Sequence, residues 1–162
     1  HGGPNKAVCV YSYDHYPYWE NLLGKKLQAP AFGENLTVSS LNEDDICIGD
    51  IFHLGTAVVQ VSQPRQPCNT LASLRGRDDM PQHLKSSGYT GFYLRVLKEG
   101  IVAKGDSLIL KEKDPSGVTV SFANHTSYHD NKNCAAIDKV LSATALSESW
   151  QQSFLKLKEQ CG

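Results

Sequence analysis

The stretch Ala-Val-Val-Gln-Val-Ser-Gln-Pro-Arg-Gln-Pro-Cys-Asn, residues 57–69, carries the strongest fold signal in this chain of 162 residues. Its first part, residues 57–61, is rich in β-branched side chains and predicts a strand. The two prolines that follow fix φ on either side of Arg65, and each restricts the residue before it to extended geometry. We therefore expect a stiff segment that presents Cys68 at a defined place after the strand.

Cys68 is placed where a thiolate is favoured. Asn69 is suited to cap a helix over residues 70–75, and a helix N-terminus and the nearby Arg65 would both stabilise a negative sulfur. The thiolate is the form of cysteine that attacks, carries sulfur or binds soft metals. The alternative is a small buried cysteine in a turn, and local chemistry alone leaves both interpretations open.

The composition is that of an ordinary globular domain. Hydrophobic residues make up 40% of the chain, charged residues make up 20%, and the formal net charge is -1. This balance favours neither nucleic acid nor an anionic membrane as a partner. Charge, glycine or proline interrupts every apolar run before it reaches membrane-spanning length. The chain shows no signal peptide, and because residue 1 is histidine, we expect that it is not the natural start.

The five cysteines stand at positions 9, 47, 68, 134 and 161. Their number is odd and none form a Cys-x-x-Cys pair. This pattern argues against a disulfide framework and against a zinc knuckle. A reducing, cytoplasmic location is the simplest prediction.

The first 120 residues predict a mainly β fold with a few short helices. Many short strands joined by glycine turns favour a barrel over a doubly wound sheet, and no phosphate-binding glycine motif is present. Helices are expected from Asp14 to a cap at Gly24, over one turn at 41–46 and over 78–87. The expected strands are 7–11, 35–38, 51–54 paired with 57–61 as a hairpin, 92–97, 100–102 and 107–110.

The pattern changes to helical after Val120. One helix is expected over 122–129 with Ser121 as its cap, a second around residues 137–141, and a third over 147–157 with Ser147 as its cap. Short helices depend on tertiary packing, so their apolar stripes should pack on one another and on the barrel. The appendage would then act as a stability cap or as a docking surface.

Two further functions are weakly indicated in the appendage. His125 and His129 are four residues apart on one predicted helix, as zinc ligands can be, but neither a third ligand nor a neighbouring catalytic glutamate is evident. The last helix carries Lys156 and Lys158 at its far end, whereas a DNA-reading helix has basic or amide residues near its start. Metal and DNA binding there are therefore not favoured.

Five motifs together resemble the MOSC family, the domains named for the C-terminal part of molybdenum cofactor sulfurases. They are His-Gly-Gly-Pro-x-Lys-Ala-Val at 1–8, Phe-Gly-Glu-Asn-Leu at 32–36, Gly-Asp at 49–50, Ser-Gln-Pro-Arg-x-Pro-Cys at 62–68 and Leu-Ser-Glu-Ser-Trp at 146–150. The most similar subgroup is the bacterial YiiM-like one. The resemblance implies a MOSC-type β-barrel over 1–120, without the family's usual first strands, and a three-α appendage over 121–162.

The resemblance also implies a chemistry. Cys68 matches the family's essential cysteine, which either carries sulfur or ligates the molybdenum of a molybdopterin cofactor, so it is the expected catalytic and metal-binding residue. YiiM-like proteins resemble reductases of N-hydroxylated compounds such as hydroxylaminopurines. A guanidinium fork suits phosphate, and paired glycines allow close approach of a cofactor. The expected cofactor-binding residues are His1, Gly2, Gly3, Lys6, Asn35, Gln63 and Arg65.

Two functions remain open at this point. The first is a molybdenum-dependent oxidoreductase acting on a small N-hydroxylated substrate. The second is a sulfur-carrier or cofactor-binding module that uses Cys68 as a persulfide without turnover of its own. No cysteine spacing suits an iron–sulfur cluster, so a separate reductase is the expected electron donor. The docking alternative for the appendage is then a surface for this electron donor. No lysine lies in a Schiff-base motif, so pyridoxal phosphate is not expected. From its own stretch alone, Asn35 is better explained as a residue that satisfies turn backbone.

Overall fold

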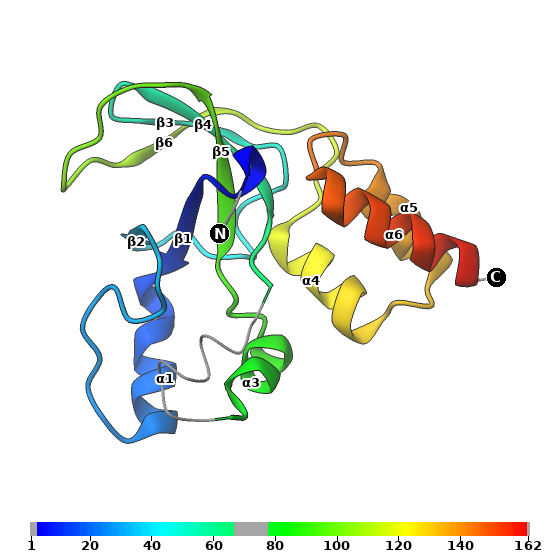
Figure 1. Cartoon of the computed structure of the whole chain (residues 1–162), viewed down its shortest axis with the longest axis horizontal. Coiled ribbons are helices and arrows are strands. Elements are labelled where there is room, and N and C mark those ends of the chain that lie inside the picture. Colours follow the sequence, from blue (N-terminus) through cyan, green and yellow to red (C-terminus); the bar gives the residue numbers. More distant parts are fainter. Residues whose placement is uncertain (1–2, 67–77, 162) are drawn as a thin grey trace.

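The computed structural model describes residues 3–66 and 78–161. The described strands form one curled, six-stranded sheet in the order β2-β1-β5-β4-β3-β6 (Figure 1). β1 and β2 run parallel, and every other pair of neighbours among these strands is antiparallel. The strands are β1 (Val8–Ser12), β2 (Leu36–Val38), β3 (Ile51–Leu54), β4 (Ala57–Pro64), β5 (Phe92–Lys98) and β6 (Leu108–Glu112). The predicted mainly β fold is thus confirmed in the form of a half-barrel.

Helices lie at two places around the sheet (Figure 1). The short 3-10 turns η1 (Pro4–Lys6) and η2 (Tyr13–His15) flank β1, and the helices are α1 (Tyr16–Leu23), α3 (Met80–Ser87), α4 (Val120–His129), α5 (Cys134–Leu141) and α6 (Glu148–Gln160). α1 and α3 end at Gly24 and Gly88, whose φ values of 68° and 75° place them in the left-handed region. Glycine adopts that conformation without strain, so both helix ends follow from the sequence.

Most predicted elements are present, and three details are wrong. Residues 100–102 form no strand, because Ile101 instead bonds to Thr56 of the β3–β4 turn through its N–H at 2.7 Å and its carbonyl at 3.1 Å. Residues 41–46 form a turn and not a helical turn. Thr119, not Ser121, caps α4, because its Oγ1 accepts from the Phe122 N–H at 3.0 Å. The helix predicted over 70–75 lies outside the described residues.

The C-terminal helices share one apolar core with the sheet, which we call the sheet–helix core. It joins strand residues such as Val61 and Leu94 to Val140, Trp150 and Phe154 of the helices. The ring centroids of Trp150 and Phe154 are 5.8 Å apart and stacked. The predicted packing of the appendage stripes on one another and on the sheet is confirmed.

A second buried cluster, which we call the aromatic core, lies between α1, α3 and the chain that follows α1. Its members are Tyr11, Tyr16, Trp19, Leu27, Ala31, Phe32, Met80 and Leu84. The rings of Tyr11 and Phe32 are 4.5 Å apart between centroids. This core reaches the sheet through Tyr11 of β1, and the carbonyl of Phe32 accepts from Arg65, which follows β4.

Cys134 and Cys161 form a disulfide, with their Cα atoms 5.5 Å apart. The expectation of no disulfide framework is therefore wrong for this pair. The two cysteines are 27 residues apart in sequence, and they meet because α6 packs back along α5. Neither the odd number of cysteines nor the missing Cys-x-x-Cys spacing indicates which cysteines the packing of the helices brings together. The cysteine pattern accordingly loses its weight as support for a reducing compartment.

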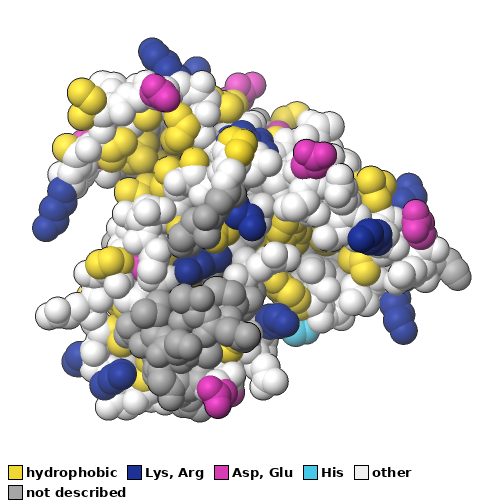
Figure 2. Space-filling view, viewed as in Figure 1, with side chains coloured by type: hydrophobic (Ala, Val, Ile, Leu, Met, Phe, Trp, Pro, Cys, Tyr) yellow, Lys and Arg dark blue, Asp and Glu magenta, His cyan; other side chains and the backbone are white. Residues whose placement is uncertain are grey.

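Figure 2 shows hydrophobic side chains gathered over the curled sheet. The exposed large apolar side chains of β5, β6 and the segment between them are Val96, Leu97, Ile101, Val102, Ile109 and Leu110. Within residues 3–66 and 78–161, no helix has the length and apolar character that crossing a membrane requires.

Candidate functional site

The segment around η1 is anchored on β4 and β5. Gly3 precedes the turn with φ 82°, a value that favours glycine. Ser62 Oγ donates to the Asn5 carbonyl, and Arg95 Nε donates to Asn5 Oδ1 at 2.9 Å. Lys6 Nζ lies 6.0 Å from the centroid of the Tyr93 ring. The predicted motif at residues 3–6 is thus fixed against the strand that leads towards Cys68.

The start of α6 meets the same strand. The Ser147 N–H donates to the Ser62 carbonyl at 2.9 Å, and Ser147 Oγ accepts from the Trp150 N–H as the helix cap. These bonds bring the appendage, the η1 segment and the end of β4 together at one place. A cavity of about 370 Å³ lies between them, lined by Gly3, Pro4, Asn5, Lys6, Gln63, Glu148, Ser149 and Gln152. We call it the Gln63 cavity.

Gln63 is the unusual member of this lining. Its side chain is 1% exposed, and its Nε2 donates to the Pro64 carbonyl at 3.2 Å. Its Oε1 is buried and has no hydrogen-bond partner among the described residues. An unsatisfied buried acceptor costs about 1–3 kcal/mol. Native proteins retain few such atoms, so Gln63 Oε1 is a candidate ligand-binding atom.

Arg65 is buried on the side of the aromatic core. Its guanidinium Nη1 donates to the Phe32 carbonyl at 2.6 Å, and its backbone N–H donates to the Gly91 carbonyl at 3.0 Å. The neighbouring Glu34 is also buried, and its carboxylate accepts from the Phe32 N–H, Tyr16 Oη and Thr37 Oγ1. Two predicted motifs, at 32–36 and 62–68, therefore meet at Arg65.

The charges of Arg65 and Glu34 both act on the thiol of Cys9. Burial raises the pKa of its thiol to about 11, although the positive charge of Arg65 acts to lower it, and Glu34 raises it further. The desolvation of the sulfur therefore outweighs the nearby guanidinium. Cys9 is protonated and unreactive near neutral pH, because the thiolate is the reactive form.

The structure gathers some of the predicted site residues and separates others. Gly3, Lys6 and Gln63 line one cavity, and Figure 2 shows Lys or Arg side chains in the middle of the face between the sheet and the C-terminal helices. Arg65 follows Gln63 closely in the chain but is held by Phe32. The predicted residues His1, Gly2 and Cys68 lie outside the described residues, and their roles stay predictions.

Asn35 lies apart from this group. Its Oδ1 accepts from the Cys9 N–H at 2.8 Å, and its own N–H donates to the Cys9 carbonyl at 2.9 Å. It lines a different cavity, of about 630 Å³, that also includes β2 and residues 102–106. These bonds fit the interpretation of Asn35 as a residue that satisfies backbone. Its assignment to the cofactor stays a prediction.

The residues that α6 contributes to the site were not predicted from the sequence. Glu148, Ser149 and Gln152 line the Gln63 cavity, whereas the appendage was expected to act as a cap or a docking surface. The signal was present in the Leu-Ser-Glu-Ser-Trp motif. Two polar residues between a helix cap and a buried tryptophan are not needed for packing.

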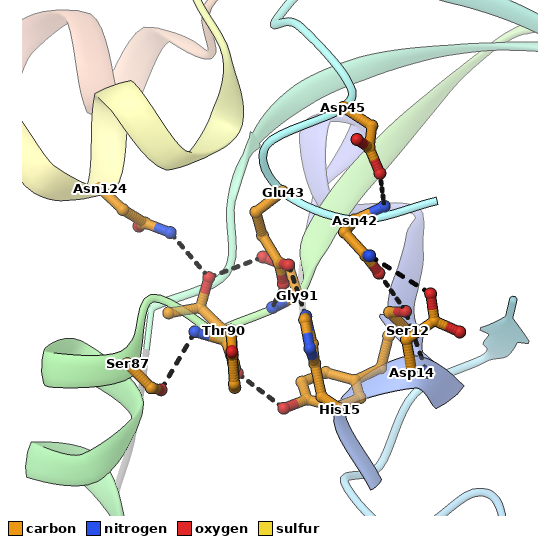
Figure 3. A network of polar contacts seen from close by, with 12 residues as sticks. Ser12, Asp14, His15, Asn42, Glu43, Asp45, Ser87, Thr90, Gly91 and Asn124 are labelled. Carbon is orange, nitrogen blue, oxygen red and sulfur yellow. Dashed lines mark hydrogen bonds and ion pairs between the residues drawn. The ribbon is translucent and has the colours of Figure 1, made fainter. Parts of the chain in front are cut away.

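A buried histidine–carboxylate pair was also missed (Figure 3). His15 Nε2 lies 2.6 Å from Glu43 Oε1, and the His15 ring stacks on Tyr89 with centroids 3.9 Å apart. Glu43 Oε2 accepts from the Gly91 N–H at 2.9 Å, and the Gly91 carbonyl accepts from the Arg65 N–H. The pair thus holds the backbone that supports Arg65. His15 and Glu43 are 28 residues apart, so no local spacing could reveal them.

The weakly indicated zinc pair in α4 has no third partner among the described residues. The rings of His125 and His129 are 5.7 Å apart, and His129 Nε2 lies 2.9 Å from the Lys85 carbonyl. Within the described ranges there is no group of three or more His, Cys, Asp or Glu side chains that could hold a metal ion.

Fold and motifs together define the class of protein. The family model "MOSC domain" matches residues 1–109, and "YiiM-like, 3-alpha helix domain" matches residues 118–160. The chain therefore belongs to the MOSC family and carries the YiiM-like three-helix appendage. Both parts of the predicted fold class are confirmed. The division into 1–120 and 121–162 remains our proposal.

Particular relatives extend this result. The chain is 55% identical over 160 residues to the uncharacterized protein YflK of Bacillus subtilis. The match covers 99% of this chain and 72% of YflK. It is 37% identical to protein YiiM of Escherichia coli, over 96% of this chain and 70% of that one. A protein named reductase from Gibberella moniliformis is 42% identical over 70% of this chain but only 21% of its own length.

Solved structures give the same result. The crystal structure of YiiM from Geobacillus stearothermophilus has a TM-score of 0.94 and 45% identity, covering 97% of this chain and 80% of that one. The crystal structure of YiiM from Escherichia coli has a TM-score of 0.93 and 35% identity, covering 99% of this chain and 81% of that one.

Proposed function

We propose that this MOSC protein is a molybdenum-cofactor-dependent reductase of small N-hydroxylated compounds of the hydroxylaminopurine type. The observation that carries the proposal is the convergence of Lys6 and the orphaned acceptor of Gln63 on one cavity, with Arg65 two residues after Gln63 in the chain. Cys68 follows three residues later. The similarity to a fungal protein named reductase supports an oxidoreductase activity.

The residues present fit such a cofactor. A molybdopterin carries an anionic phosphate, a ring with N–H donors and a metal that a thiolate can ligate. Arg65 supplies positive charge for the phosphate, Lys6 supplies N–H donors to the cofactor, and Gln63 Oε1 supplies a buried acceptor for the ring. Cys68 is proposed as the thiolate ligand from its place in the motif, because a soft sulfur suits a metal already held by sulfur.

The proposed reaction breaks the N–O bond of R–NH–OH and yields R–NH₂ and water. It consumes two electrons and two protons, and a separate reductase is proposed as the electron donor. The cofactor, when bound, supplies a metal that cycles by two electrons and accepts the substrate oxygen. Lys6 donates hydrogen bonds to the bound cofactor from the Gln63 cavity. Arg65 is fixed by its bond to the Phe32 carbonyl, so its positive charge stays beside the start of the Cys68 segment.

Metal analysis tests the proposal most directly. The protein is produced in a host that makes the cofactor, and molybdenum is measured together with the reduction of 6-hydroxylaminopurine by an artificial donor. We expect bound molybdenum and turnover in the wild type, and loss of both in Cys68→Ser. Cys9→Ser and Cys47→Ser serve as controls, because both of these cysteines are buried and unpaired. Persulfide on Cys68 without molybdenum would favour the sulfur-carrier alternative, and full activity in Cys68→Ser would exclude both.

The basic residues allow a graded test. Lys6→Ala and Arg65→Ala should each lower cofactor retention by about ten-fold, equivalent to about 1.4 kcal/mol. Lys26→Ala is the matched control, because its side chain is 93% exposed on another part of the molecule. Unchanged molybdenum occupancy in the first two variants would place the phosphate elsewhere.

A further inference from the structure

The Leu-Ser-Glu-Ser-Trp motif at the start of α6 has two kinds of residue. Leu146, Ser147 and Trp150 are buried, and they pack in the sheet–helix core or cap the helix. Glu148 and Ser149 are exposed and line the Gln63 cavity. Packing and capping explain the first group. In the second group, Glu148 Oε1 accepts from Gln152 Nε2 at 3.4 Å and Ser149 Oγ lies 3.4 Å from Ser147 Oγ, and both side chains keep further hydrogen-bonding capacity. The appendage therefore presents two polar side chains to a cavity whose other wall is the proposed cofactor segment.

The polar groups of this cavity have a defined hydrogen-bonding character. Gln63 Oε1 is a buried acceptor without a partner among the described residues. The Glu148 carboxylate can only accept, and the Lys6 ammonium can only donate. A ligand that satisfies all three must offer two donors and one acceptor.

A free anion is a poor match to this arrangement. The N-terminus of α6 and Lys6 would each attract a phosphate. However, Ser147 already caps the helix, and Glu148 places a negative charge at its first position. A phosphate dianion also has no proton to donate to Gln63 Oε1, so a neutral ligand with N–H groups fits better.

We propose that the Gln63 cavity is a subsite for the 2-amino-4-oxo edge of a pyrimidine ring, the edge shared by pterins and guanine. The amino group and the adjacent ring N–H donate to Glu148 and Gln63 Oε1, and the ring carbonyl accepts from Lys6. The volume of about 370 Å³ lies within the range of small-ligand sites. This deepens the proposed function and rests on it for the kind of ring, which comes either from the cofactor or from a purine substrate.

Titration of the metal-free, full chain tests the subsite without any turnover. Pterin fluorescence measures binding, and lumazine, which has an oxo group in place of the 2-amino group, is the matched ligand. Guanosine and inosine form a second pair that differs by the same amino group. We expect the amino member of at least one pair to bind about ten-fold tighter than its partner. Preference within the pterin pair assigns the subsite to the cofactor ring, and preference within the nucleoside pair assigns it to a purine.

Variants connect that preference to the named residues. Gln63→Leu and Glu148→Ala should each reduce the preference to about three-fold or less. Glu159→Ala, an exposed acidic residue near the far end of α6, should keep it. Glu148 is exposed, so its variant folds even if the buried substitution at Gln63 does not. Equal affinity within both pairs, or an undiminished preference in Glu148→Ala, would overturn the subsite. Neither result bears on molybdenum retention, so the reductase proposal stands or fails separately.

Discussion

The sheet–helix core and the aromatic core bury side chains by different means. The first is built largely from aliphatic side chains that share surface but make few directional bonds, and the indole Nε1 of Trp150 is buried in it without a partner among the described residues. In the second, ring groups bond to one another and to backbone. Trp19 Nε1 donates to Tyr11 Oη at 2.6 Å, and Tyr11 Oη donates to the Tyr89 carbonyl at 2.7 Å.

This difference indicates that the sheet–helix core contributes mainly stability, whereas the aromatic core also positions polar groups. Burial of apolar area is not directional, so the sheet–helix core can hold the appendage firmly without fixing any one polar atom. Hydrogen bonds have defined distances and angles, so the aromatic core can fix Phe32 and Glu34, and through Phe32 the guanidinium of Arg65. We expect substitutions in the first core to change mainly the free energy of unfolding. Substitutions in the second should also change cofactor retention.

The largest expected effect is in the sheet–helix core. Trp150→Ala removes a ring that is 3% exposed and should lower the free energy of unfolding by about 3–5 kcal/mol. Trp150→Phe is the control, because it keeps most of the apolar surface and deletes the unpartnered indole N–H. Urea unfolding measures both. An equal loss in the two variants would contradict the view that shape and area dominate this core.

The disulfide between Cys134 and Cys161 should come next. A cross-link that closes 27 residues constrains the unfolded chain, and native disulfides typically contribute about 2–4 kcal/mol. Reductant should therefore lower the unfolding free energy of the wild type by that amount. Cys134→Ser should show the lower value with and without reductant. If reductant leaves the unfolding free energy of the wild type unchanged, the disulfide does not stabilise the appendage.

A smaller effect is expected in the aromatic core. Tyr16→Phe removes the hydroxyl that donates to Glu34 and accepts from the Ala31 N–H at 2.9 Å. It leaves a buried N–H unpaired and should cost about 1–3 kcal/mol. Tyr13→Phe is the matched control, because the Tyr13 side chain is 49% exposed. Cofactor retention should fall in Tyr16→Phe and stay unchanged in Tyr13→Phe. Equal retention would mean that this core does not position the site.

The two cores also differ in how far they could be predicted. Helical spacing of Trp150, Phe154 and Leu157 was enough to predict that the appendage packs on the sheet, because an apolar stripe must find a partner. Glycine caps and the hairpin at 51–61 follow from local backbone preferences. Local sequence patterns extend over only a few residues, so they cannot reveal contacts between distant segments.

The site was only partly predictable for the same reason. The motif residues Lys6, Gln63 and Arg65 were identified by resemblance, but their separation into a cavity group and an aromatic-core group needed the fold. Neither the His15–Glu43 pair nor the disulfide has a sequence signal, because their members are 28 and 27 residues apart. The side chains of α6 reach the cavity only through the packing of the whole appendage.

The smallest effect concerns Cys9, which lies in β1 two residues before Tyr11 of the aromatic core. Burial raises the pKa of its thiol from 9.0 to about 11, so the thiol is protonated in both the folded and the unfolded chain at neutral pH. As the pH rises above 9.0, the unfolded chain ionises first, and the stability that the buried neutral thiol contributes is lost as the pH passes through the folded value near 11. The loss should reach about 1 kcal/mol near pH 10.

The comparison of wild type with Cys9→Ala isolates this contribution. Cavity formation lowers the stability of the variant at every pH. The informative quantity is therefore the difference between the two curves of unfolding free energy against pH. That difference should be flat below pH 9.0 and should shrink between 9.0 and about 11. Parallel curves across this window would show that the sulfur is hydrated in the native protein. The aromatic core would then be open to water at its border with β1, and it could not hold Arg65 in the desolvated position that the Phe32 bond implies.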